Sequence, residues 1–343
     1  MKALVLEQYH RLVYRDIPDP EPGPEEALVR VVACGICGSD VHGLDGSTDR
    51  RVPPLIMGHE AAGTIALLGS QVTDWQVGER VTLDSTIFCG TCHFCRRGDI
   101  NLCDRRRVLG VSCEEYRRDG AFAEYVTVPA RTLYRVPEGL ALEHATLVEP
   151  LSVAVHAVGR ARPSLGDSAA VVGVGTIGLL VVQALRAAGC GPIVAVDPDG
   201  RRLEVARRCG ASLCVDPRST DVAAQVRQAT GGRGADVAFE VVGTPEAMAT
   251  AVGCARKGGA VVLVGNISPG VELPLQAVVT RQLTLYGSAA SRGEYPVCLE
   301  LMARGAVDPG ALVSAVAPLA EGAAWFTRLR AREPGLLKVI LRP

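Results

Sequence analysis

A glycine-rich turn at residues 173–178, with the pattern Gly-x-Gly-x-x-Gly, constrains the fold of this chain more than any other feature. It follows an apolar, β-branched segment at 168–174 and opens a helical pattern, after which a second apolar segment at 193–196 ends at Asp197. Glycines in such a turn allow a phosphate to approach the backbone, and an acid about 20 residues further on accepts ribose hydroxyls. The spacing therefore predicts a strand-helix-strand unit that binds a dinucleotide.

Strand and helix patterns continue to alternate after this unit. Helices are predicted at about 201–209, 222–230 and 247–255, and strands at about 213–215, 237–241 and 260–264. Such alternation predicts an α/β fold with a doubly wound parallel sheet. The residues expected to contact the dinucleotide are Gly173, Gly175, Ile177, Gly178, Asp197, Arg202, Val264 and Gly265.

The choice of cofactor depends on Asp197. A carboxylate at this position accepts both ribose hydroxyls and repels a 2′-phosphate, which favours NAD over NADP. Arg201 and Arg202 lie nearby and weaken this preference. Gly243 and Gly265 follow two of the predicted strands, where they either let the nicotinamide end approach the backbone or serve as ordinary turn glycines.

The chain contains 12 cysteines, and its first ten residues show no basic start followed by a long apolar stretch. This combination favours metal ligation over a disulfide scaffold. Four of the cysteines fall within 15 residues in the pattern Cys-x2-Cys-x2-Cys-x7-Cys, at Cys89, Cys92, Cys95 and Cys103. Four thiolates leave no open position on a zinc ion, so the site is predicted to be structural, with an iron-sulfur cluster as the alternative.

A second cluster mixes three kinds of ligand. Residues 34–42 contain Cys37, Asp40 and His42, and residues 58–60 read Gly-His-Glu. A catalytic zinc typically takes three protein ligands and keeps a fourth position open. Cys37, His59 and one carboxylate would suffice, although an isolated histidine is more often an ordinary core or surface residue.

Length and composition limit the number of domains and the kinds of partner that we expect. With 343 residues the chain exceeds what one hydrophobic core usually organises, so two domains are expected. Its 36 basic and 37 acidic residues are too balanced for nucleic-acid binding, and the longest uncharged run, 168–185, is interrupted by glycines. We therefore expect no nucleic-acid partner, no membrane segment and a cytoplasmic location.

Taken together, these motifs resemble the zinc-containing medium-chain dehydrogenases, nearest to the sorbitol (polyol) and threonine dehydrogenase branch. The matching segments also include residues 119–125, with the sequence Asp-Gly-Ala-Phe-Ala-Glu-Tyr, and residues 149–152. The resemblance implies a GroES-like catalytic domain made of residues 1–152 and 289–343, with the structural-zinc lobe at 85–110. The NAD-binding domain would be residues 153–288. It also implies a homodimer or homotetramer joined near residues 283–287.

The resemblance assigns roles to single residues. Cys37 and His59 are implied as catalytic zinc ligands, with Glu60 and Glu149 as the two carboxylates that complete the metal site or exchange in it. Glu149 is expected in or next to the ligand sphere without substrate, and Glu60 is expected to move in on exchange. The same resemblance makes Asp40 the acid that orients the ligand histidine, and Ser39 and His42 the proton relay.

The implied reaction is oxidation of a secondary alcohol to a ketone with hydride transfer to NAD, the alcohol being a polyol or sugar derivative. Sorbitol dehydrogenases commonly carry a tyrosine where this chain has Gly43, and an Arg-Tyr pair where it has Ala290-Ser291. Sorbitol itself is therefore disfavoured. The arginines at 50, 51 and 292 are either solvated surface or contacts for a phosphorylated or acidic polyol or an amino acid. L-threonine 3-dehydrogenase activity and a non-catalytic NAD- and zinc-binding protein are the alternatives.

Overall fold

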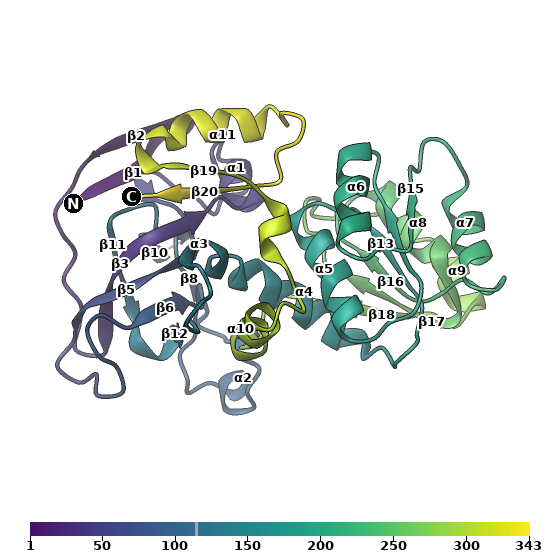
Figure 1. Ribbon diagram of the computed structural model, residues 1–343, viewed down its shortest axis with the longest axis horizontal. Helices are drawn as coiled ribbons and strands as arrows, with labels where there is room; N and C mark the ends of the chain where they lie inside the picture. Colours follow the sequence, from purple (N-terminus) through teal and green to yellow (C-terminus); the bar gives the residue numbers. More distant parts are fainter. Residues whose placement is uncertain (114–115) are drawn as a thin grey trace. The chain divides into compact units, whose positions relative to one another are not determined.

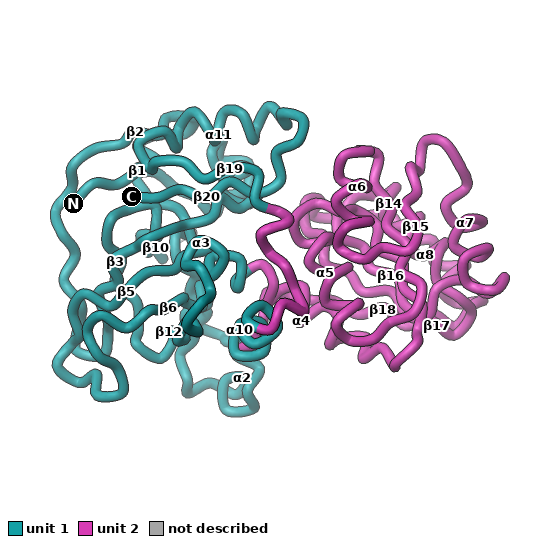
Figure 2. The backbone as a smooth tube through the Cα atoms, in the orientation of Figure 1, with its two compact units in different colours: residues 1–149, 295–303, 313–343 teal, residues 150–294, 304–312 magenta. Residues whose placement is uncertain are grey.

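The computed structural model describes residues 1–113 and 116–343, which divide into two compact units. Unit 1 comprises Met1–Glu149, Tyr295–Ala303 and Val313–Pro343, and unit 2 comprises Pro150–Glu294 and Arg304–Leu312 (Figure 2). The unit borders lie within six residues of the domain limits expected from the sequence. The return of residues 304–312 to unit 2 was not expected.

Unit 1 is built on an antiparallel sheet that is extended by the C-terminal strands. Six of its strands follow the order β12-β6-β5-β3-β20-β19 (Figure 1). The seventh strand, β11, is outside this order and pairs with β3. These strands are β3 (Glu26–Gly35), β5 (Glu60–Leu68), β6 (Arg80–Leu83), β11 (Tyr125–Pro129), β12 (Leu133–Arg135), β19 (Val313–Pro318) and β20 (Lys338–Arg342). Only β19 and β20 pair in parallel.

Smaller elements complete unit 1. They are the strands β1 (Lys2–Gln8), β2 (Arg11–Asp16), β4 (Leu55–Ile56), β7 (Thr86–Ile87), β8 (Arg107–Val108), β9 (Val111–Cys113) and β10 (Tyr116–Arg118), and the helices α1 (Gly38–Gly43), α2 (His93–Arg96), α3 (Leu142–Ala145), α10 (Tyr295–Ala303) and α11 (Gly322–Arg330). Helix α4 (Val148–Ala161) begins in unit 1 and continues into unit 2. The unit 1 core takes side chains from both ends of the chain, including Leu4, Phe122, Phe326 and Leu341.

Unit 2 contains the parallel sheet that the alternating pattern predicts. Its strand order is β15-β14-β13-β16-β17-β18, in the strands β13 (Ala169–Val172), β14 (Ile193–Val196), β15 (Leu213–Val215), β16 (Ala235–Glu240), β17 (Ala255–Leu263) and β18 (Thr284–Gly287). The helices are α5 (Thr176–Ala187), α6 (Gly200–Arg208), α7 (Val222–Ala229), α8 (Pro245–Cys254) and α9 (Leu275–Thr280). The order reverses between β13 and β16, which defines a Rossmann-type sheet and confirms the predicted fold class.

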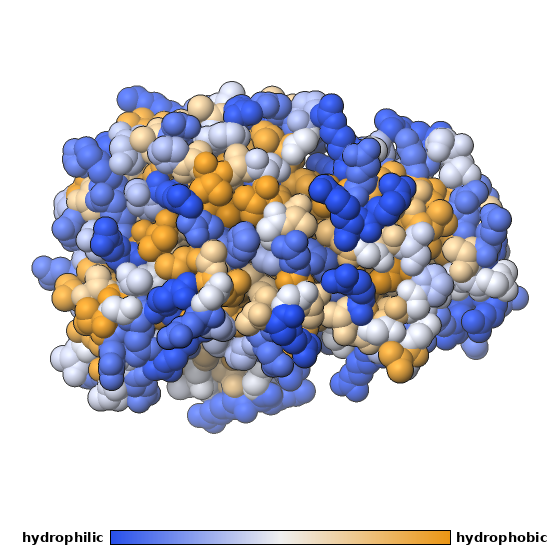
Figure 3. All heavy atoms as spheres, viewed as in Figure 1, coloured by the Kyte–Doolittle hydropathy of each residue, from blue (hydrophilic) through white to orange (hydrophobic). Residues whose placement is uncertain are grey.

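Hydrophilic and hydrophobic side chains are mixed on the surface. On the face drawn in Figure 3, hydrophilic side chains are widespread and hydrophobic ones are visible among them. Among the residues that the structure describes, no helix is both long enough and apolar enough to cross a membrane.

Candidate active site

His59 lies at the entry to β5, in a segment that backbone hydrogen bonds hold in place. Gly58 has φ +94°, a conformation that favours glycine, and a Cβ there would crowd Phe122 and the Cys34 sulfur. The segment at 119–122 supplies the hydrogen bonds: Ala121 N donates to Gly58 O over 2.9 Å, and Phe122 N donates to Met57 O over 3.0 Å. The Asp-Gly-Ala-Phe motif therefore supports the segment that ends at His59.

Cys37, His59 and Glu60 form a compact group whose ligand atoms all lie within 4.8 Å of one another. Cys37 is the N-cap residue of α1, and Glu60 is the first residue of β5. His59 and Glu60 are buried, whereas Cys37 is partly exposed. One thiolate, one imidazole and one carboxylate at this spacing fit a zinc ion, because zinc takes all three ligand types.

Asp40 lies behind this group and contacts His59. The Asp40 side chain is fully buried, and its Oδ1 lies 3.4 Å from His59 Nδ1, while Cys37 N donates to its Oδ2 over 3.3 Å. Burial alone would raise the pKa of Asp40, but His59 and Arg51 hold it well below its usual range. Asp40 is therefore anionic, and its place beside Nδ1 leaves Nε2 as the nitrogen available to a metal.

Ser39 and His42 lie three residues apart on α1, so they share one face of the helix. Both side chains are exposed, in contrast to Asp40 between them. This arrangement suits a pair of groups that meets a substrate on one side and solvent on the other.

Glu60 has a partner that the sequence did not suggest. Lys338 Nζ donates to both Glu60 oxygens, over 2.8 and 2.7 Å, and to Ile36 O over 2.9 Å. Both side chains are at most 2% exposed. Gly35 makes room for the carboxylate, because a Cβ at that position would overlap Glu60 Oε2. The available signal was a single lysine inside the apolar segment 336–341, since a buried cation requires a counter-charge.

Glu149 lies outside the compact ligand group. It is in the first turn of α4, is half-buried and accepts a hydrogen bond from Ser85 Oγ over 3.2 Å. Burial raises the pKa of Glu149, and the nearby Glu60 raises it further while His59 lowers it. The structure thus groups Glu60 with Cys37 and His59, and Glu149 lies outside that group. Which of the two carboxylates binds a metal without substrate stays a prediction.

The sequence led us to expect that Arg50 and Arg51 are either solvated or bind substrate, and the structure places Arg51 differently. Arg50 is exposed, but Arg51 is only 4% exposed. Arg51 Nη2 donates to Asp40 Oδ1 over 3.1 Å and to Ser39 Oγ over 3.2 Å. Arg51 is therefore already paired within unit 1 and is not a free contact for a substrate anion.

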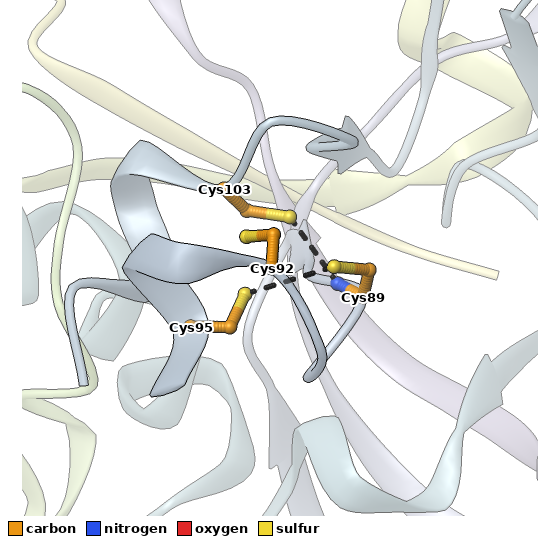
Figure 4. A group of neighbouring side chains, drawn as sticks. All are labelled: Cys89, Cys92, Cys95 and Cys103. Carbon is orange, nitrogen blue, oxygen red and sulfur yellow. Dashed lines mark hydrogen bonds between the residues drawn. The ribbon is translucent and has the colours of Figure 1, made fainter. Parts of the chain in front are cut away.

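The four cysteines of the lobe lie close together, and Figure 4 shows their side chains turned toward one another. Cys89 N donates to Cys103 Sγ over 3.3 Å, and Cys89 Sγ lies 3.9 Å from Cys95 Sγ. Backbone hydrogen bonds, chiefly from Thr91, lower the pKa of Cys89 to about 5, whereas burial and the neighbouring Cys92 raise that of Cys95 to about 12. Four sulfurs at this spacing fit one tetrahedral zinc ion.

In unit 2 the glycine turn and Asp197 have the geometry that their spacing predicts. Gly173 has φ +90°, and a Cβ on Gly178 would overlap Gly173 O, so the helix can approach the strand only with glycine there. Asp197 follows β14, is 3% exposed and accepts hydrogen bonds from Val174 N and Asp199 N, each over 2.9 Å. Each carboxylate oxygen keeps a further acceptor site.

The remaining expected cofactor contacts are also in unit 2. Ile177 lies in the first turn of α5, and Arg202 Nη1 is 3.7 Å from Asp197 Oδ2. Val264 N donates to Glu240 O. A Cβ on Gly265 would overlap Gly243 N, so these two glycines permit the loops after β16 and β17 to pack together. This contact supports the interpretation of both as structural glycines.

A Rossmann-type unit combined with a unit that carries a mixed sulfur, nitrogen and oxygen metal group defines the class of metal-dependent, nucleotide-linked oxidoreductases. Comparison with known proteins identifies the family. Residues 23–138 match the alcohol dehydrogenase GroES-like domain, and residues 176–304 match the zinc-binding dehydrogenase domain. The chain belongs to the zinc-containing medium-chain dehydrogenases, in the branch that includes sorbitol and threonine dehydrogenases.

Three relatives illustrate this. Sorbitol dehydrogenase of Bacillus subtilis is 35% identical over 92% of this chain and 89% of its own. L-threonine 3-dehydrogenase of Pyrococcus horikoshii is 36% identical over 79% of this chain and 78% of its own. The solved structure of a provisionally assigned zinc-binding dehydrogenase from Sinorhizobium meliloti, bound to NADP, has a TM-score of 0.91 and 33% identity, covering 100% of this chain and 99% of that one.

Proposed function

We propose that the protein oxidises a secondary alcohol of the polyol or sugar-derived class to a ketone, with NAD as the hydride acceptor. The observation that carries this proposal is the Cys37, His59 and Glu60 group beside a helix that exposes Ser39 and His42. When bound, a zinc ion at this group would supply Lewis acidity toward an alcohol oxygen, and bound NAD would accept the hydride. We assign the four-cysteine lobe to a second, structural zinc ion.

The residues of the chain have distinct tasks in this reaction. Ser39 accepts the hydroxyl proton of the substrate and passes its own proton to His42, whose exposed side chain releases it to solvent. Asp40 holds His59 in orientation through Nδ1. Lys338 donates hydrogen bonds to Glu60 and neutralises its charge, so the lysine holds this carboxylate in place beside Cys37 and His59. Glu149, close to the same charges, is the second carboxylate that we propose for exchange at the metal.

The proposed substrate class rests on the relatives of the chain and on the residues at positions 43, 51, 290 and 291. Similarity to a sorbitol dehydrogenase supports a polyol, but Gly43 and Ala290-Ser291 differ from the sorbitol dehydrogenase pattern. Because Arg51 is buried against Asp40, it does not favour a phosphorylated substrate. We therefore propose a neutral polyol other than sorbitol. Similarity to a threonine dehydrogenase makes L-threonine the second candidate.

A substrate panel tests the proposal directly. Purified protein is assayed for NADH formation with neutral polyols, polyol phosphates and L-threonine, before and after removal of zinc with a chelator. We expect zinc-dependent turnover of neutral polyols. Turnover confined to L-threonine would replace the polyol assignment, and no turnover on any member despite two bound zinc ions would favour a non-catalytic protein.

The preference for NAD is a separate proposal, supported by the buried Asp197 carboxylate at the end of β14. The Sinorhizobium relative holds NADP, so the choice requires a measurement on this protein. We expect Asp197→Asn to raise the KM for NAD about tenfold, since a hydrogen bond to a charged group contributes ~1.5–3 kcal/mol. Asp199→Asn, which changes the same charge at the cap of α6, should have a much smaller effect. A wild-type preference for NADP would contradict the assignment of Asp197.

We also propose a homodimer or homotetramer assembled through β18 and located in the cytoplasm. β18 is an edge strand of the unit 2 sheet, and edge strands are normally covered. Leu275 and Val279 of the preceding helix α9 are more than 60% exposed, which supports an apolar contact at this edge. Thiolate zinc sites suit a reducing compartment. Sedimentation analysis of the wild type and of Val279→Glu tests the assembly, and a monomeric wild type would contradict it.

A further inference from the structure

We propose that Arg51 is a positioning residue of the reaction, whose buried guanidinium holds Asp40 and Ser39 together, and that Gly43 is required because the Arg51 side chain lies over it. The inference rests on the proposed function, since it gives a partner to the Ser39 hydroxyl. It adds a charged residue that touches neither metal nor cofactor but sets the orientation of two groups that do the chemistry.

The first argument is the geometry of the guanidinium. Arg51 Nη2 lies 3.1 Å from Asp40 Oδ1 and 3.2 Å from Ser39 Oγ, and Arg51 Nη1 donates to Arg50 O over 3.2 Å. The same Asp40 oxygen lies 3.4 Å from His59 Nδ1. Arg51 and His59 therefore share one carboxylate oxygen, so movement of Arg51 would change the position of the group that orients His59.

The second argument concerns the Ser39 hydroxyl. A hydroxyl has two acceptor lone pairs and one proton to donate. Arg51 occupies one lone pair, and a guanidinium has no acceptor that could take the hydroxyl proton. The second lone pair is then left for the proton of an alcohol substrate, and the serine proton must point to another acceptor. Donation from Arg51 thus gives the hydroxyl a direction that suits proton transfer out of the site.

The third argument is the steric fit between Gly43 and the Arg51 side chain. Gly43 is buried at the end of α1, and a Cβ at that position would overlap Arg51 Cγ and lie 3.0 Å from Arg51 Cβ. No side chain at position 43 is compatible with Arg51 as it lies. Any larger residue at position 43 would displace the arginine that holds Ser39 and Asp40.

The test compares Arg51→Gln, Arg51→Lys and the control Arg50→Gln, which removes a positive charge from the exposed neighbouring side chain. Three quantities are measured: kcat and KM with the best alcohol of the panel, the rate at which a chelator removes zinc from the catalytic site, and the affinity for NAD. Loss of an outer partner of a metal ligand typically costs ~10–100-fold. We expect Arg51→Gln to lower kcat by about tenfold or more and to speed zinc release, with NAD affinity and the control unchanged. For Arg51→Lys we expect a kcat and a zinc-release rate between those of the wild type and those of Arg51→Gln.

Gly43→Ala gives an independent route to the same defect, because it displaces the Arg51 stem without removing its charge. Its effect should resemble that of Arg51→Gln and should largely disappear in an Arg51→Ala background, where the stem is absent. If Arg51→Gln does not fold, Arg51→Lys and Gly43→Ala decide the question. Wild-type kcat and zinc release in Arg51→Gln, or equal effects in Arg50→Gln, would overturn the inference. If the wild type oxidises no alcohol, the proposed function fails, whereas zinc release still decides whether Arg51 positions the His59 group.

Discussion

The two candidate zinc sites of this protein, the four-cysteine lobe and the Cys37, His59 and Glu60 group, are organised in opposite ways. All four sulfurs of the lobe come from 15 consecutive residues, they are mostly partly exposed, and the described side chains between 84 and 108 do not contribute to the unit 1 core cluster. The Cys37, His59 and Glu60 group joins two chain segments. Its buried carboxylate, Glu60, is paired with Lys338, and Asp40 behind the group is paired with Arg51. The lobe is thus a local structure that needs its metal, whereas the other site is supported by the surrounding fold.

The largest expected difference between the sites is in turnover. His59→Ala removes a metal ligand from a segment that backbone hydrogen bonds hold in place, so we expect the fold to persist and activity to fall by more than the ~100-fold that loss of an outer partner costs. Zinc content should drop from two ions to one per chain. Metal analysis, circular dichroism and kcat/KM check this result. A variant that unfolds would show that His59 is needed for the fold as well.

A change to the buried ion pair should cost the most stability. Lys338→Met leaves Glu60 charged and buried, and breaking such a pair typically costs ~3–5 kcal/mol of unfolding free energy. Lys338→Met combined with Glu60→Gln removes the unpaired charge and should recover most of that loss. Urea unfolding of the two variants and the wild type measures the difference. Equal stability of the single variant and the wild type would mean that the pair does not support the site.

A change in the lobe should remain local. Cys95→Ser removes one of four thiolates, so the lobe is expected to lose its zinc and become sensitive to proteolysis between residues 89 and 103. Because the lobe lies outside the core cluster, it can unfold without the rest of unit 1, and the urea midpoint should change less than in Lys338→Met. Zinc content and limited proteolysis test this. A loss of global stability as large as that of Lys338→Met would remove the contrast between the sites.

The smallest expected effect is a difference in thiol reactivity after zinc has been stripped from the protein. Without zinc the lobe is expected to open, so its cysteines become accessible, whereas Cys34 stays buried in the unit 1 core and burial raises its pKa well above the usual range. The lobe cysteines should therefore react with iodoacetamide at least ten times faster than Cys34, since the thiolate is the reactive form. Mass spectrometry of modified peptides checks the order, which uniform labelling would contradict.

Sequence reasoning predicted the geometry best where the residues concerned are close together in the chain. The four-cysteine spacing, the glycine turn with Asp197 and the alternation of unit 2 are local patterns, and the structure brings each set together. It was less successful where partners are distant in the chain. Arg51 was interpreted as surface or substrate-binding because its burial depends on packing over Gly43, and the ion pair of Glu60 with Lys338 was not predicted.

The sequence by itself therefore determined the chemistry: which thiolates, imidazole, carboxylates and glycines are present, and at what spacing. The tertiary structure decided how the charges are paired. Gly35 of β3 is paired with Glu60 of β5 on one side and with Ile340 of β20 on the other, and this register places Lys338 against a carboxylate 278 residues away. No local pattern encodes such a contact, because only the folded sheet brings the two strands to opposite sides of β3, and burial then requires each charge to have its partner.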